Sequence, residues 1–152
     1  MQRSYRLMGA AALVVAGLQL AACSPVEEEV ALSEPSHVEA VEGSEFSHIT
    51  LEERAAERID LQTLPIVEKR MISGPSKGKQ RQVIPYGALI YDAEGGAFAY
   101  TNPEPLEFVR ARLEIDYIES GKVFLKSGPA TGTEVVTVGA MELWGAETGV
   151  GH

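Results

Sequence analysis

Hydrophobic and polar positions alternate most clearly within residues 83–143, where short apolar runs are separated by Gly, Pro, Asn and Asp. A period of two, sustained over nine residues, predicts a strand with one buried face and one solvated face. The clearest such segment is 108–117. On its apolar side are Val109, Ala111, Leu113, Ile115 and Tyr117, and between them lie Arg110, Arg112, Glu114 and Asp116.

A hairpin is expected directly after this strand. Glu119, Ser120 and Gly121 form a three-residue loop in this interpretation, with glycine where a left-handed backbone is needed. The apolar face then fixes the register, because a slip of one residue would turn every side chain to the wrong face. The predicted pairs, starting from the loop, are Ile118 with Lys122, Tyr117 with Val123, Ile115 with Leu125 and Glu114 with Lys126.

The rest of the stretch reads as further strands and turns. The expected strands are 83–91, 97–101 (with Phe98 and Tyr100 on one face) and 134–138, and 141–144 is a short terminal element. The turns between them are predicted at 92–96, at 102–105 and at 127–133, from their Gly, Pro, Asn and Asp content.

The residues before this stretch add a strand at 48–51, a short helix and an edge strand. Thr50 and Glu53 have the spacing of a capping box, and Leu51, Ala55 and Ile59 follow on one helical face. Residues 61–67 read as a strand, and Pro65 favours an edge position because it has no N–H for the ladder. Residues 73–80 form a loop; Gly78-Lys79 lacks the flanking residues of a phosphate-binding loop.

Together these segments predict a small, mainly β domain over residues 46–152. We expect an antiparallel β-roll or barrel-like sheet with one short helix near its start. Its roughly 105 residues are just enough to support an independent core.

The N-terminal 22 residues have the pattern of a secretory signal. Arg3 and Arg6 precede an apolar run, 8–20, that is too short to span a bilayer comfortably. The run ends in Leu-Ala-Ala before Cys23, the only cysteine in the chain, and this resembles the bacterial lipobox. The resemblance implies cleavage before Cys23 and lipidation of its thiol, which would anchor the protein to a membrane and leave no thiol for other chemistry. The alternative is an ordinary secretory signal.

Residues 23–45 read as an acidic, disordered tether. They contain seven glutamates, no Lys or Arg, and several Pro, Gly and Ser residues, so they cannot bury enough apolar surface to offset the entropy of ordering. The whole chain has a net charge of −9. Removing 1–22, with two bases and no acid, leaves 11 bases against 22 acids, or −11. This balance argues against nucleic acid, or anionic lipid headgroups, as the main ligand.

Residues 83–139 contain, in order, VIPYGAL at 83–89, AFAY at 97–100, a hairpin, and G-x-x-V-V-x-x-G at 132–139. With these motifs in this order, the stretch 48–143 resembles the membrane-proximal domain of periplasmic adaptor (membrane fusion) subunits of RND-type efflux pumps. Residues 48–67 resemble the segment that precedes the lipoyl-like domain in those adaptors, many of which are lipoproteins. The resemblance implies a β-domain that contacts an inner-membrane transporter.

The chain departs from a complete adaptor between these two segments. Only residues 68–80 stand where an adaptor carries its lipoyl-like, helical-hairpin and β-barrel domains. We therefore expect a membrane-proximal domain standing alone, and the complete adaptor function does not carry over.

Three classes of function follow from these observations. The favoured one is a non-enzymatic, lipid-anchored accessory module of an efflux transporter, in the cell envelope, facing the periplasm or the cell exterior. The alternative is an extracytoplasmic binding or sensing lipoprotein, with metal as the most plausible ligand; the residues considered are His37, His48, His152, Met71 and Met141. Their scattered spacing favours no metal site and no cofactor. An enzyme is disfavoured, since no nucleophile motif is present. Trp144 is expected either in the core or at a contact surface.

Overall fold

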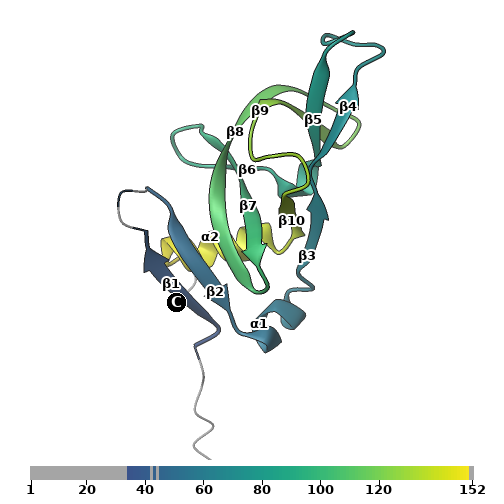
Figure 1. Ribbon diagram of the computed structural model, residues 1–152. Helices are drawn as coiled ribbons and strands as arrows, with labels where there is room; N and C mark the ends of the chain where they lie inside the picture. The colour runs from purple at the N-terminus through teal and green to yellow at the C-terminus, as the bar shows by residue number, and fades with distance from the viewer. Residues whose placement is uncertain (1–33, 42, 44, 151–152) are drawn as a thin grey trace, which may run out of the picture. The chain divides into compact units, whose positions relative to one another are not determined.

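The computed structural model describes residues 34–41, 43 and 45–150, and it confirms a mainly β, antiparallel fold (Figure 1). Leu32–His152 forms one compact unit. In chain order the elements are β1 Ser36–Ala40, β2 Ser47–Leu51, α1 Glu53–Arg58, β3 Gln62–Pro65, β4 Val67–Arg70, β5 Gln80–Pro85, the 3₁₀ turn η1 Tyr86–Ala88, β6 Ile90–Tyr91, β7 Ala97–Glu104, β8 Glu107–Glu119, β9 Lys122–Ser127, β10 Glu134–Val138 and α2 Ala140–Thr148.

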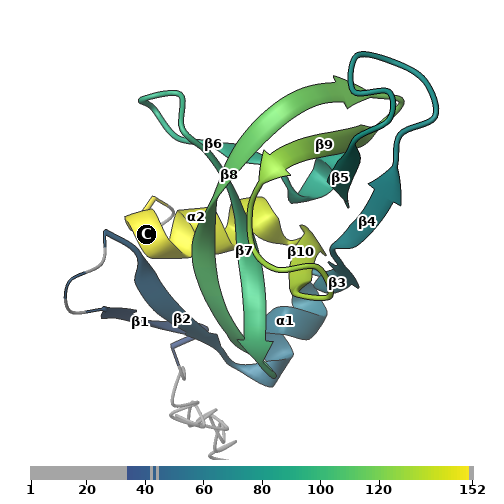
Figure 2. The same cartoon turned by 45° about the horizontal axis from the view of Figure 1, so that its top comes forward.

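Strand β8 organises the sheet, because its two halves pair with different neighbours. Its first half lies between β7 and β2, and its second half pairs with β9. The main path of the sheet is β3-β10-β7-β8-β9-β5-β4, with β2 also on β8, β1 on β2, and β6 on β7. Along this path the sheet curls until it is nearly closed, as the barrel-like prediction required (Figure 2).

The predicted hairpin is confirmed, but its loop is one residue shorter. Ser120 and Gly121 alone form the turn, with φ of 51° and 72°, and positive φ at both central positions is what a type I′ turn needs. Glu119, Ile118 and Tyr117 therefore pair with Lys122, Val123 and Phe124, so the first two predicted pairs are wrong. The register then shifts on both sides of Ile115, which restores the predicted pair Ile115 with Leu125 and sets Glu114 opposite Ser127 in the ladder. The expected contact of Glu114 with Lys126 is still made by the side chains, whose charged atoms lie 3.4 Å apart.

Two other predicted boundaries are wrong for local reasons. Residues 83–91 are not one strand: β5 begins at Gln80, η1 interrupts the run, and β6 holds only Ile90 and Tyr91. The turn expected at 102–105 lies later, at 105–106, and β7 continues to Glu104. Pro103 is tolerated there because the pairing of β7 with β8 is irregular between Thr101 and Glu104, so no ladder hydrogen bond needs its N–H.

The folded part begins about ten residues earlier than predicted. Ser36–Ala40, assigned above to the tether, forms strand β1 and pairs with all of β2. Thr50 lies within β2, so it cannot cap α1; the N-cap position is Glu52, and no side chain caps this helix. The capping box was therefore wrong, although the helix itself is confirmed. Strand 61–67 divides into β3 and β4, and Pro65 lies in β3 at the edge of the sheet, as expected.

The core consists of two clusters on opposite sides of the curled sheet. One packs against the helices and contains Ile49, Leu51, Ile90, Tyr100, Phe108, Val136, Ala140 and Leu143. The other contains Ile66, Ile84, Ala88, Ala99, Leu113, Val123, Leu125 and Val135. Trp144 is half-buried against the first cluster, because the expected short terminal element is in fact the nine-residue helix α2. Trp144 is thus a core-packing residue.

Candidate functional site: an apolar groove beside two edge strands

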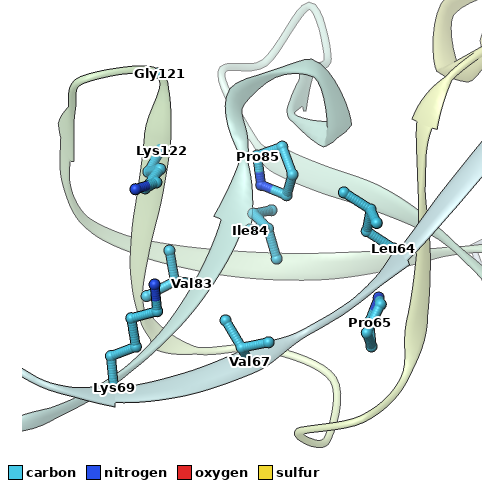
Figure 3. A pocket seen from close by; sticks show the side chains of 9 residues that line it. All are labelled: Leu64, Pro65, Val67, Lys69, Val83, Ile84, Pro85, Gly121 and Lys122. Carbon is cyan, nitrogen blue, oxygen red and sulfur yellow. The ribbon is translucent and has the colours of Figure 1, made fainter.

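An open apolar groove of about 330 Å³ lies where β3 passes into β4 (Figure 3). Its apolar side chains come from β3, β4 and β5, and the turn residue Gly121 and the first residue of β9, Lys122, lie at one end. Its lining residues are Leu64, Pro65, Val67, Lys69, Val83, Ile84, Pro85, Gly121 and Lys122. Leu64 and Val67 are 49% and 40% exposed, so part of the apolar surface faces solvent.

The groove is bordered by the two strands that end the sheet path. Strand β3 pairs only with β10, and β4 pairs only with β5, so each has one unpaired edge within the described part of the chain. Between them, the backbone of Ile66 bonds to the loop before β10: Thr133 O accepts from Ile66 N at 2.9 Å, and Ile66 O accepts from Gly132 N at 2.8 Å. The polar backbone groups of an unpaired strand edge are available to an incoming extended segment.

Two lysines give the groove a positive side. Figure 3 shows the side chains of Lys69 and Lys122 on one side, and Leu64 and Pro65 on the other. Neither ammonium group has a carboxylate within 4 Å among the described residues. The groove therefore has the features of a binding surface, namely apolar side chains, unpaired strand edges and two cations.

The hairpin turn is placed at the groove by the backbone. Gly121 O accepts a hydrogen bond from Tyr86 N at 2.9 Å, which ties η1 to the turn. Pro85 and Lys122 are register partners in the β5–β9 pair, so both residues at this end are set by the ladder. The groove is thus a property of the folded sheet, formed without a separate loop.

Elsewhere, the best-connected ionisable residues are Arg110 and Glu147, which join α2 to the sheet. Their side chains are 12% and 4% exposed, and Arg110 Nε lies 2.8 Å from Glu147 Oε2. Glu147 also accepts hydrogen bonds from the Tyr100 hydroxyl at 2.5 Å and from Ser47 N at 3.2 Å. Burial, and then this hydrogen bond to Glu147, raise the pKa of Tyr100 well above its usual range. The guanidinium lies 4.7–5.0 Å from three ring centroids, those of Phe46, Phe98 and Trp144.

A second polar cluster holds the β4–β5 hairpin against β8. Asp116 accepts a hydrogen bond from the Ser76 hydroxyl and an ion-paired one from Arg81 Nε at 2.7 Å. The Ser76 hydrogen bond and then Arg81 hold the pKa of Asp116 below its usual range. Beside it, desolvation raises the pKa of Tyr117. Both clusters fix one element to another, and neither opens onto the groove.

The residues considered above for metal binding lie apart. His37 pairs with Glu39 at 3.1 Å and His48 with Glu107 at 3.4 Å, on the strand pairs at the start of the domain. Met71 follows β4, and Met141 is exposed on α2. Within the described residues, no three His, Cys, Asp or Glu side chains come together in a way that could hold a metal ion. His152 and the expected lipidation site Cys23 lie outside the described residues.

The groove could not be recognised from the sequence, because its lining comes from separate segments that meet only in the fold. The one signal was the edge position of Pro65. In the described part of the chain, no helix has the length and hydropathy needed to cross a bilayer. When the chain is compared with models of protein families and with curated proteins, neither comparison gives a match.

Proposed function

We propose that this protein is a non-enzymatic, lipid-anchored docking module of the cell envelope, serving an inner-membrane transporter of the RND type or a related one. Cys23 would carry the lipid, and the β-domain would bind the transporter. The proposal draws its partner from the resemblance of 48–143 to adaptor membrane-proximal domains. A curled antiparallel β-domain is consistent with that resemblance.

The observation that carries the proposal is the groove beside β3 and β4. An extended segment of the transporter could pair with an unpaired strand edge through its backbone and place apolar side chains on Leu64, Val67 and Val83. An acidic residue in that segment would meet Lys69 and Lys122. Such binding needs no complete adaptor, because it uses only one domain.

Co-purification with groove variants tests this function. The full lipidated chain, with a C-terminal tag, would be expressed in the organism that encodes it and isolated from membranes in mild detergent. We expect a transporter subunit to be recovered, identified by mass spectrometry, and to be lost with Leu64→Ser combined with Val67→Ser. Met141→Ser is the matched control, since Met141 is an exposed apolar residue on α2, outside the groove.

Recovery of no transporter subunit would overturn the proposal, and so would equal recovery by the groove variant and the control. Thermal unfolding of both variants would show whether each is folded, so that loss of binding is not confused with loss of structure.

A further inference from the structure

A hairpin with unusual charge projects from the domain at the end far from β1 and α1 (Figures 1 and 2). Residues 69–82 contain five of the 13 basic residues of the chain and no acid, whereas the chain as a whole carries −9. These bases are Lys69, Arg70, Lys77, Lys79 and Arg81. The positive charge of an acidic protein is therefore concentrated on the β4–β5 hairpin.

Most of these basic side chains are exposed and have no ion-pair partner among the described residues, so they could contact a ligand. Arg81 is paired with Asp116, but Arg70, Lys77 and Lys79 are exposed and have no carboxylate within 4 Å among the described residues. Glu68 directly precedes this run of residues, and Asp116 pairs with Arg81 from β8. The five cations counted together with these two carboxylates give a net charge of +3.

The tip between the strands is ordered and presents an aliphatic side chain. Met71 N donates to Lys79 O at 2.9 Å, and Gly78 N donates to Met71 O at 2.7 Å, which closes the neck of the loop. The Ser76 side chain is folded back onto Asp116 and is only 2% exposed. Ile72, in contrast, is 85% exposed.

We propose that the β4–β5 hairpin docks on an anionic bilayer surface, with Ile72 entering the headgroup region and Arg70, Lys77 and Lys79 facing lipid phosphates. Basic residues beside a bilayer are attracted to anionic lipids, and an aliphatic side chain among them gains from leaving water. The net negative charge of the whole chain should repel an anionic surface only weakly at this hairpin, because exposed charges more than about 10 Å apart are largely screened at 0.1 M salt.

The expected anchor at Cys23 makes a bilayer the favoured partner over an acidic protein. Ser36, the start of β1, is thirteen positions after Cys23, so the chain between them can span at most about 45 Å. A unit of this size has a radius of gyration near 13 Å, hence a diameter of roughly 35 Å. The anchored domain can therefore turn its hairpin to the same membrane. The choice of a bilayer rests on the lipid anchor of the function proposed above, but not on the binding of a transporter in the groove.

Vesicle binding tests the hairpin directly. The probe is a chain starting at residue 24, which is not lipidated and retains the whole compact unit with both core clusters. We expect it to sediment with phosphatidylcholine vesicles that contain roughly 30% phosphatidylglycerol, not with phosphatidylcholine alone, and to be released by raising the salt.

Paired variants localise the contact. Lys77→Gln with Lys79→Gln should weaken binding to the anionic vesicles roughly 25-fold, at about fivefold for each cation. Ile72→Ser should weaken it about tenfold. Arg54→Gln with Arg58→Gln makes the same charge change on exposed positions of α1 and should leave the hairpin contact intact.

Three results would overturn the proposal: no preference for anionic vesicles, an equal loss in the α1 control, or binding unchanged by Ile72→Ser. If the unaltered chain ignored vesicles, and the lysine pair instead weakened recovery of a transporter subunit, the hairpin would belong to an acidic protein contact. Thermal unfolding of each variant confirms that it is folded.

Discussion

Glu147 is a position where a substitution that hardly changes the shape of the side chain should strongly lower the stability of the fold. Glu147→Gln keeps the size of the side chain but removes the charge that faces Arg110, a guanidinium only 12% exposed. Breaking a buried ion pair from one side leaves the other charge uncompensated, which costs about 3–5 kcal/mol. The three rings beside Arg110 remain to stabilise the charge of the guanidinium after its ion-pair partner is lost, which places the cost at the lower end of this range. We therefore expect Glu147→Gln to lower the free energy of unfolding by about 3 kcal/mol.

A double-mutant cycle separates the pair from the packing. Urea unfolding would be measured for Glu147→Gln, for Arg110→Met, and for the double variant, which leaves no unpaired charge at the site. We expect the double variant to be more stable than the sum of the two single effects predicts, with a coupling of at least about 1.5 kcal/mol. A coupling below about 0.5 kcal/mol would refute the argument, because it would mean that the ion pair is solvated and that α2 is held by its apolar contacts alone.

Three further predictions concern single sites. The pKa of Asp116 is depressed in the folded state, so the stabilisation that this carboxylate provides is present above about pH 4 and is lost as pH falls through the folded-state pKa. Asp116→Asn should therefore lower the thermal midpoint at pH 7 and make the midpoint less dependent on pH in the acid range. Circular dichroism melts from pH 7 to pH 2.5 measure both effects. Ser120→Asn should raise stability by about 0.5 kcal/mol in urea unfolding, since asparagine tolerates the positive φ of the turn better than serine. Gly87→Ala should cost about 3 kcal/mol, because its Cβ would lie 2.7 Å from the backbone oxygen of Thr137, whereas Gly95→Ala, with open space around it, should cost about 1 kcal/mol.

Each of these has an outcome that would contradict it. An Asp116→Asn variant with the acid profile of the unaltered protein would show that Ser76 and Arg81 do not depend on the carboxylate. A destabilising Ser120→Asn would mean that Ser120 and Gly121 do not form a type I′ turn. Equal costs at Gly87 and Gly95 would show that the Thr137 backbone does not exclude a side chain at position 87.

Alternation predicted the strand β8 itself, but not the burial of its two faces: on the side expected to be buried only Leu113 is fully buried, and Phe108 on the opposite side is buried as well. The pattern also failed on the polar face of the strand. Arg110 and Asp116 are expected there in contact with solvent, but each forms an ion pair with a residue remote in sequence. Only the fold brings Glu147 and Arg81 to these positions. The hairpin register shows the same limit, since Ile115 pairs with Leu125 as predicted, yet only because the ladder shifts beside it.

Composition was the weaker guide to boundaries. The acidic character of 23–45 predicted a tether throughout, but β1 is held by backbone pairing with β2, which requires no apolar side chains. The run 83–91 was continuous in hydropathy, and nothing in that pattern marks the close passage of Gly87 against Thr137. The groove could not be predicted for a similar reason, because the residues that line it are brought together only by the strand order of the sheet.

The two strands beside the groove also carry a risk, because unpaired edges on separate copies of a protein can join and begin an aggregate. Their sequences limit this hazard. Strand β3 is four residues long and ends in Pro65, which cannot extend a ladder. Strand β4 is equally short, and Glu68, Lys69 and Arg70 occupy three of its four positions. If the chain is held at a membrane as proposed, these features would disfavour pairing between the strand edges of its own copies.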